Sequence, residues 1–167
     1  MPTSRTTKKS RIASPSESQA TPWRLYAHPA FREKWERLIA EVESLRRADS
    51  KGYIGHPKTK LLKRLQELIL HEIPSHPDSE HYQLGNTLGP SHRHWRRAKF
   101  LGRFRLFYRF DSQHRIIVYA WVNDENTLRK AGARTDPYVV FRSRLKGGNP
   151  PDGWTDLVAA SHPLNRP

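Results

Sequence analysis

The stretch WRRAKFLGRFRLFYRF, residues 95–110, decides the fold together with IIVYAWV, residues 116–122. Apolar and basic residues alternate through the first stretch with a period of two, which is the pattern of strands that pack one face on a core. Leu101 and Gly102, and then residues 111–114, are short connections, so we predict a three-stranded antiparallel meander. The last stretch is almost wholly apolar, as expected of a strand that is covered on both faces.

Helical patterns flank this meander. Residues 28–49 and 57–74 carry large apolar side chains at steps of three and four, and each predicts an amphipathic helix, the second ended by Pro74. A last helix is predicted over residues 136–148, with an Asp cap, a Pro in the first turn and a Gly pair at its end. The expected fold class is therefore α+β: an N-terminal helical hairpin packed on a small antiparallel β-sheet, with a C-terminal helix.

The chain has room for one domain, which we place over residues 23–160. Residues 1–22 are expected to form a disordered basic tail, with an ordered arm that tracks phosphates as the alternative. Residues 161–167 are expected to form a flexible C-terminal tail. The segment 75–93 is rich in His, Pro, Gly and Ser and predicts a long connection, and such loops are often functional. Trp154 is expected to pack on the body of the domain.

The charge of the chain points to a polyanionic partner. Thirty Lys and Arg against 16 Asp and Glu give a net charge of +14, which favours nucleic acid over acidic lipid. There is no cysteine, so disulfides and thiolate metal sites are excluded, in keeping with a reducing, cytoplasmic location. No stretch has the roughly 18 apolar residues that a membrane span needs, so no membrane partner is expected.

Half of the excess charge lies on the predicted sheet. Between Arg93 and Arg115 there are eight Lys or Arg residues and one Asp. Like charges side by side on a sheet repel one another, and a bound phosphate would relieve the repulsion through charge-assisted hydrogen bonds. The alternatives are a solvated basic face and a nucleic-acid footprint without catalysis. If Phe100 and Phe104 share the core face, the residues expected to project from the opposite face are Arg97, Lys99, Arg103, Arg105 and Arg109. Of these, Arg97 and Arg105 are expected to be exposed.

The sequence narrows the phosphate chemistry. It contains neither clustered carboxylates for a two-metal nuclease nor a Gly-rich phosphate loop. His92 and His94 are spaced like a metal pair, but no further ligand stands out, so a surface loop is preferred and no metal or other cofactor is expected. The reaction that remains is cleavage of RNA by attack of its own 2′-hydroxyl on the phosphate. Arg and Lys would stabilise the negative charge that develops on the phosphoryl oxygens. Lys99, a His, a Tyr or a carboxylate would act as acid and base.

Five motifs follow one another along the chain: Trp23–Pro29, Trp95–Phe100, Arg105–Arg109, Ala120–Asn126 and Thr135–Tyr138. Together they resemble the YhaV-type toxins of the RelE/ParE superfamily, and the resemblance covers roughly residues 23–158. It implies a RelE-like fold and an endoribonuclease that acts as the toxin of a toxin–antitoxin pair. It also implies mRNA as the target, free or on the ribosome, and an antitoxin partner of the PrlF type with a swapped-hairpin DNA-binding domain.

Carried over position by position, the resemblance implies basic site residues at Arg97 and Lys99 and a phosphate-contacting strand arginine at Arg105. Tyr138 falls near an aromatic acid–base position. Asn123, Asp124 and Glu125 match an acidic turn, for which a chemical role and an ordinary turn with a helix cap are equal alternatives. The expected catalytic residues are Arg97, Lys99, Arg105, Glu125 and Tyr138. The expected RNA-binding residues are His94, Arg96, Arg103, Arg109 and Arg129.

Two other functions stay open at this point. A ParE-like toxin would share the fold but inhibit a topoisomerase, and the dense basic face argues against it, because a protein target needs no phosphate clamp. A non-catalytic RNA- or DNA-binding module would use the same charge without cutting.

Overall fold

The computed structural model of the protein describes residues 22–166. The predicted meander is confirmed: it consists of three consecutive antiparallel strands at one side of a five-stranded sheet with the order β2-β3-β4-β1-β5. The turn between the first two uses positive φ angles at Leu101 (44°) and Gly102 (77°) and places Lys99 directly opposite Arg105. The three strands are β2 (Arg96–Phe100), β3 (Phe104–Asp111) and β4 (Ile116–Val122).

Two further strands make the sheet mixed, which corrects the expectation of a purely antiparallel sheet. β1 (Arg24–Ala27) pairs in parallel with β4, and β5 (His162–Pro163) pairs antiparallel with β1. Four and two residues are too few to show a period, so the alternation that identified the other strands was absent here.

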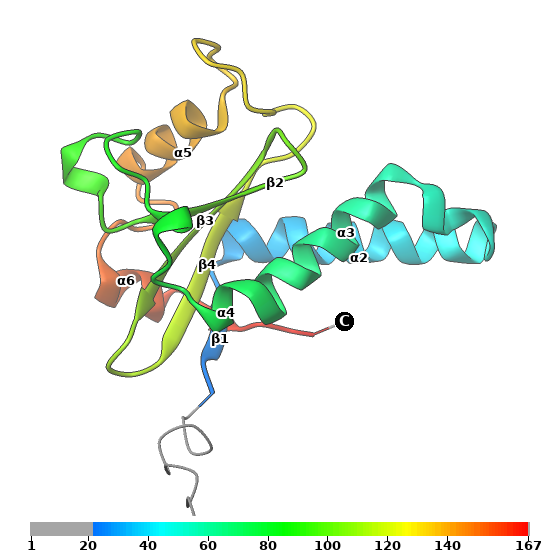
Figure 1. Ribbon diagram of the computed structural model, residues 1–167, viewed down its shortest axis with the longest axis horizontal. Helices are drawn as coiled ribbons and strands as arrows, with labels where there is room; N and C mark the ends of the chain where they lie inside the picture. Colours follow the sequence, from blue (N-terminus) through cyan, green and yellow to red (C-terminus); the bar gives the residue numbers. More distant parts are fainter. Residues whose placement is uncertain (1–21, 167) are drawn as a thin grey trace, which may run out of the picture.

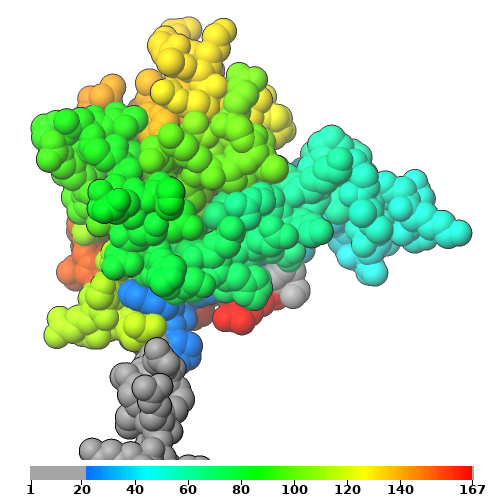
Figure 2. Space-filling model, in the orientation of Figure 1, coloured from blue at the N-terminus to red at the C-terminus, as the bar shows by residue number. Residues whose placement is uncertain are grey.

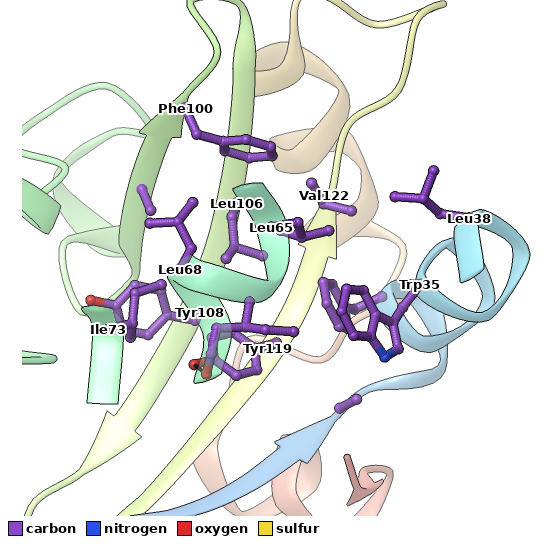
Figure 3. Close-up of a cluster of buried hydrophobic side chains, with 14 of the residues drawn as sticks. Trp35, Leu38, Leu65, Leu68, Ile73, Phe100, Leu106, Tyr108, Tyr119 and Val122 are labelled. Carbon is purple, nitrogen blue, oxygen red and sulfur yellow. Dashed lines mark hydrogen bonds between the residues drawn. The ribbon is translucent and has the colours of Figure 1, made fainter. Parts of the chain in front are cut away.

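The helical hairpin covers one face of the sheet (Figure 1). α2 (Pro29–Ala48) is followed by a 3-10 turn (Gly52–Gly55) and by α3 (Pro57–Glu67). A π-helical turn (Leu68–Glu72) and the short α4 (Ile73–Ser75) then complete the second helical segment, so Pro74 lies in the last turn. Figure 3 shows Trp35 and Leu38 of α2 and Leu65 of α3 packed toward Tyr119 and Val122 of β4.

A second apolar cluster covers the opposite face, which was expected to be open and basic. α5 (Pro137–Lys146) has the predicted Asp136 cap and lies across the sheet, and α6 (Trp154–Ala159), which was not predicted, follows it. Phe141 of α5 stacks on Phe107 of β3, with ring centroids 4.2 Å apart. Both faces of β4 are therefore covered, as its apolar sequence indicated.

Tails were expected at both ends of the chain, but the structure describes mainly the C-terminal one. The disordered tail expected over residues 1–22 lies outside the described residues, Pro22 excepted. Residues 161–166 do not extend from the domain as expected for a flexible tail: Leu164 donates its backbone N–H to Leu25, and the backbone oxygen of Asn165 accepts the indole N–H of Trp35. The segment between α4 and β2 contains two short 3-10 turns, Glu80–Tyr82 and Pro90–His92.

None of the described helices combines the length and the apolar composition that crossing a lipid bilayer requires.

Candidate phosphate-binding site

The hydroxyl of Tyr138 is the point at which three elements meet. It accepts a hydrogen bond from Nη1 of Arg97 on β2 (3.1 Å) and another from Nε of Arg105 on β3 (3.2 Å). Tyr138 lies in the first turn of α5, where the Asp136 side chain accepts its backbone N–H, so the cap of the helix fixes its position. Since both guanidinium groups donate, the phenolic proton is directed away from them.

Arg105 is buried, which corrects the expectation that its side chain is exposed: only 7% of it is accessible, because α5 lies over it. Its Nη1 donates to the backbone oxygens of Gly102 (2.9 Å) and Phe104 (2.8 Å). This guanidinium is held by three hydrogen bonds before any ligand arrives, and its removal would therefore cost stability.

Arg97 and Lys99 lie beside it on β2. Nη2 of Arg97 donates to the backbone oxygen of Gln83 (3.0 Å), and its Nε is buried without a hydrogen-bond partner among residues 22–166. Lys99 is exposed, and the positive charge of Arg97, followed by partial burial and by the charges of Arg105 and Arg129, lowers its pKa. The like charges are therefore brought together as the strand alternation predicted.

The segment after β4 adds a further cation. The guanidinium of Arg129 lies over the ring of Tyr138 at 4.8 Å and pairs with Asp136. Arg103, at the end of the β2–β3 turn, donates through Nε to the backbone oxygen of Arg129 (3.1 Å). Figure 2 shows this segment, in yellow, lying against the end of the β2–β3 hairpin. We call the group the Tyr138 cluster; it consists of Arg97, Lys99, Arg105, Arg129 and Tyr138, with Arg103 at its edge.

Three of the predicted RNA-binding residues lie outside the Tyr138 cluster. Arg96 is on the face of β2 turned toward the helical hairpin, where its guanidinium packs on Phe110 at 5.6 Å. Arg109 is on the same face as Arg105 but is half-buried between Trp95 and Trp154, and it donates to the backbone oxygen of Asp152. His94 also contacts Asp152.

The acidic turn after β4 is mainly structural. The Asn123 side chain accepts the backbone N–H of Arg105 (2.7 Å) and donates to the backbone oxygens of Arg103 and Thr127. Asp124 forms an ion pair with Lys34 on α2 (2.8 Å). Glu125 lines a hollow against α2, and no hydrogen bond or ion pair of the described residues joins it to the Tyr138 cluster.

Two carboxylates that join these groups of side chains were not predicted as site residues. Asp136 is buried and is the carboxylate that balances Arg129, whereas the sequence pattern identified it only as a helix cap. Asp152 meets His92 and His94 although it lies 60 and 58 residues further along the chain, a proximity that no local spacing reveals.

Four cations and a phenol gathered against a single carboxylate form a site whose chemistry suits phosphate groups. The chain matches the family model Toxin_YhaV, described as a toxin with endonuclease activity, of a toxin-antitoxin system, over residues 25–162. It is 43% identical over 138 residues, 81% of this chain and 90% of the relative, to the ribonuclease toxin YhaV of Escherichia coli K12 and equally to toxin YhaV of the strains CFT073 and O157:H7.

The chain therefore belongs to the YhaV toxin family, and it is an endonuclease toxin that works with an antitoxin. This excludes the two alternatives left by the sequence, a topoisomerase inhibitor and a binding module without catalysis. A solved structure, the toxin-antitoxin complex RelBE2 from Mycobacterium tuberculosis, matches 63% of this chain and 100% of its own with 17% identity and a TM-score of 0.41. A likeness of that size carries no argument about function.

Proposed function

We propose that the protein cleaves RNA at the Tyr138 cluster by attack of a 2′-hydroxyl on the adjacent phosphate. The observation that carries the proposal is the convergence of Arg97 and Arg105 on one hydroxyl, with Lys99 beside them. Rigid guanidinium groups stabilise charge that develops on phosphoryl oxygens, and they do so without reorganisation during the reaction.

Each proton of the reaction has a candidate group. The 2′-oxygen loses its proton as it bonds to phosphorus, and the leaving 5′-oxygen gains one, so a 2′,3′-cyclic phosphate and a 5′-hydroxyl form. The phenol of Tyr138, whose proton points away from the arginines, is suited to donate to the leaving oxygen. Lys99, with its lowered pKa, is suited to accept the proton of the 2′-hydroxyl or to stabilise the phosphate.

Neither of these steps requires a divalent ion. The cluster already carries four cations, and their repulsion disfavours a further one. Arg129, in the cluster, and Arg103, at its edge, are placed to hold the neighbouring nucleotides.

The specific substrate and the type of antitoxin are inferred from the resemblance of the motifs to those of YhaV-type toxins. We infer that mRNA, free or on the ribosome, is the substrate, that the antitoxin is of the PrlF type, and that both are met in the cytoplasm. Purification of the toxin with a co-expressed PrlF-type antitoxin tests the partner, and an assay with and without ribosomes tests the substrate.

The test of the site compares two neighbours on one strand. Arg97→Ala removes a donor from the cluster and is expected to lower kcat by about 100–1,000-fold. Arg96→Ala changes the next residue, on the opposite face, and should leave kcat within about threefold of wild type, since a surface cation contributes little to a remote transition state.

The substrate is labelled RNA with chelator present, and the products are resolved at nucleotide level. An RNA with a single 2′-deoxy nucleotide at the cleavage position should resist cleavage there. Equal rates for Arg97→Ala and wild type would show that the Tyr138 cluster is not the active site. Cleavage at the 2′-deoxy position would overturn the proposed attack.

A further inference from the structure

A second cluster of polar groups lies beyond the Tyr138 cluster on the same face of β3. Nδ1 of His92 and Nε2 of His94 both point at Oδ1 of Asp152, at 2.9 Å and 3.0 Å. All three atoms lie within 4.8 Å of one another. The histidines come from the loop before β2, and the aspartate comes from the segment before α6.

We propose that His92, His94 and Asp152 bind one divalent transition-metal ion, with zinc as the expected occupant. Two imidazole nitrogens and one carboxylate oxygen are a common protein ligand set for zinc, and water completes the tetrahedron. With bonds of about 2.0–2.1 Å, the ligand atoms of such an ion stand about 3.4 Å apart. Each histidine nitrogen needs to move only a few tenths of an ångström away from Oδ1 to reach that spacing, and the two nitrogens lie within 4.8 Å of each other.

The surroundings hold the carboxylate in place. Trp95 donates its indole N–H to the same Oδ1 (2.8 Å), and Arg109 donates to the backbone oxygen of Asp152 (2.7 Å). These two contacts orient the carboxylate, as outer contacts around metal ligands commonly do.

The charge of Arg109 opposes a cation here, and its effect is limited by geometry. Its guanidinium is packed between the rings of Trp95 and Trp154 and is directed at a backbone oxygen, not at Oδ1. The carboxylate cancels one of the two charges of the ion. An affinity weaker than that of four-ligand structural zinc sites is the consequence.

The proposed metal site is separate from the Tyr138 cluster, and a bound ion would stabilise the fold instead of taking part in cleavage. Arg109, which contacts Asp152, is four residues along β3 from Arg105, which corresponds to about 13 Å. An ion would join the loop before β2 to the segment that leads into α6, two parts of the chain far apart in sequence. Binding only to the folded state raises stability.

The experiment uses the full chain, without a histidine tag and freed of metal with a chelator. Zinc is titrated by calorimetry, and cobalt is added in parallel because tetrahedral Co²⁺ has a characteristic visible absorption. We expect one ion per chain, and at a free zinc concentration about 100 times the Kd, a rise of about 5–10 °C in Tm.

Two variants remove ligands and one is a matched control. His94→Ala, at an exposed position, and Asp152→Asn, which keeps the shape of the side chain, should each weaken zinc binding by at least about 10-fold. His114→Ala removes a histidine that also contacts an aspartate, Asp111, but has no third group, and should bind zinc like the wild type.

A hydrogen-bonded clamp without a metal is the competing interpretation of the same contacts. It predicts no saturable zinc binding and no cobalt absorption, and either result overturns the site. Zinc affinity that is equal in wild type, His94→Ala and Asp152→Asn would also overturn it, because the ion would then be bound elsewhere.

Discussion

At the scale of single residues, the phenol of Tyr138 connects structure with chemistry. Its ring packs edge-on against Phe107 in the apolar cluster, with centroids 5.6 Å apart, while its oxygen accepts hydrogen bonds from two arginines. The ring positions the oxygen, and the oxygen in turn satisfies the buried Nε of Arg105. One side chain thus belongs to both the core and the candidate active site.

Tyr138→Phe separates these roles. The ring is kept, so unfolding should become easier by only about 1–2 kcal/mol, from the unsatisfied arginine. The rate of RNA cleavage should fall by about 100-fold or more, because the acid is lost. Tyr108→Phe is the matched control: it removes a buried hydroxyl bonded to the backbone oxygen of Pro77, on the other face of the sheet. Tyr108→Phe should lower the free energy of unfolding, measured with urea, by a similar amount and should leave the rate of RNA cleavage unchanged. Equal cleavage rates for the two variants would contradict the role of Tyr138.

At the scale of elements, the periodicity of apolar residues predicted the helices and strands that have a regular apolar face. The steps of α2 and α3, the cap of α5 and the alternation of β2 and β3 all appear as expected, and alternation also placed Arg97, Lys99 and Arg105 on one face. It did not reveal that α5 covers this face and buries Arg105, because helix packing depends on contacts between distant segments. The same reason hid Asp152 and the short strand β1.

The burial of β3 corrects an expectation about its phenylalanines. The alternation of apolar and basic residues predicts that Phe104 packs in the core, but it is only partly buried, whereas Phe107 is fully buried and stacks on Phe141. Phe107→Ala should therefore lower the free energy of unfolding by about 3–5 kcal/mol. Phe104→Ala should cost clearly less, and urea denaturation of both variants measures the difference. A larger loss for Phe104→Ala would contradict the packing of β3 against α5.

The start of α2 gives the protein a pH dependence. Nδ1 of His28 accepts the backbone N–H of Ala30 and caps the helix, and burial, followed by the charge of Arg144, lowers the pKa of His28 to about 4. The unfolded chain binds this proton near pH 6.5 and the folded one only near pH 4. Stability from this group is therefore complete above about pH 6.5 and is lost as the pH falls toward 4, by up to about 3 kcal/mol.

His28→Asn tests this contribution, since Asn caps helices well and does not titrate in this range. The variant should match the wild type at pH 7.5 and exceed it at pH 4.5 in the free energy of unfolding, measured with urea at both values. Parallel losses for the two proteins between these pH values would show that His28 is not the group responsible.

At the scale of the whole molecule, β3 carries two polar sites on one face while the helical hairpin covers the other. The Tyr138 cluster lies near the β2–β3 turn, and the His92, His94 and Asp152 group lies further along the same strand. Figures 1 and 2 show the far end of the helical hairpin, where α2 leads into α3, projecting away from the sheet and from the segment after β4. Half of the net charge of +14 lies in residues 93–115, which supply three of the four cations of the Tyr138 cluster, and the other half lies elsewhere along the chain.

Salt separates the contributions of these regions to RNA binding. Arg97, Lys99, Arg103 and Arg129 offer about four phosphate contacts, so the affinity for an RNA with a 2′-deoxy cleavage position should fall by about 50-fold between 50 and 200 mM NaCl. Arg103→Ala should lower the slope of log Kd against log salt by about 0.7. Lys63→Ala removes one charge from the exposed surface of α3 and should leave the slope unchanged, because a fixed contact, not overall charge, releases the counterion. Equal changes in slope for the two variants would mean that RNA is bound through the total charge of the protein. That result would contradict the proposal that the Tyr138 cluster positions the RNA strand.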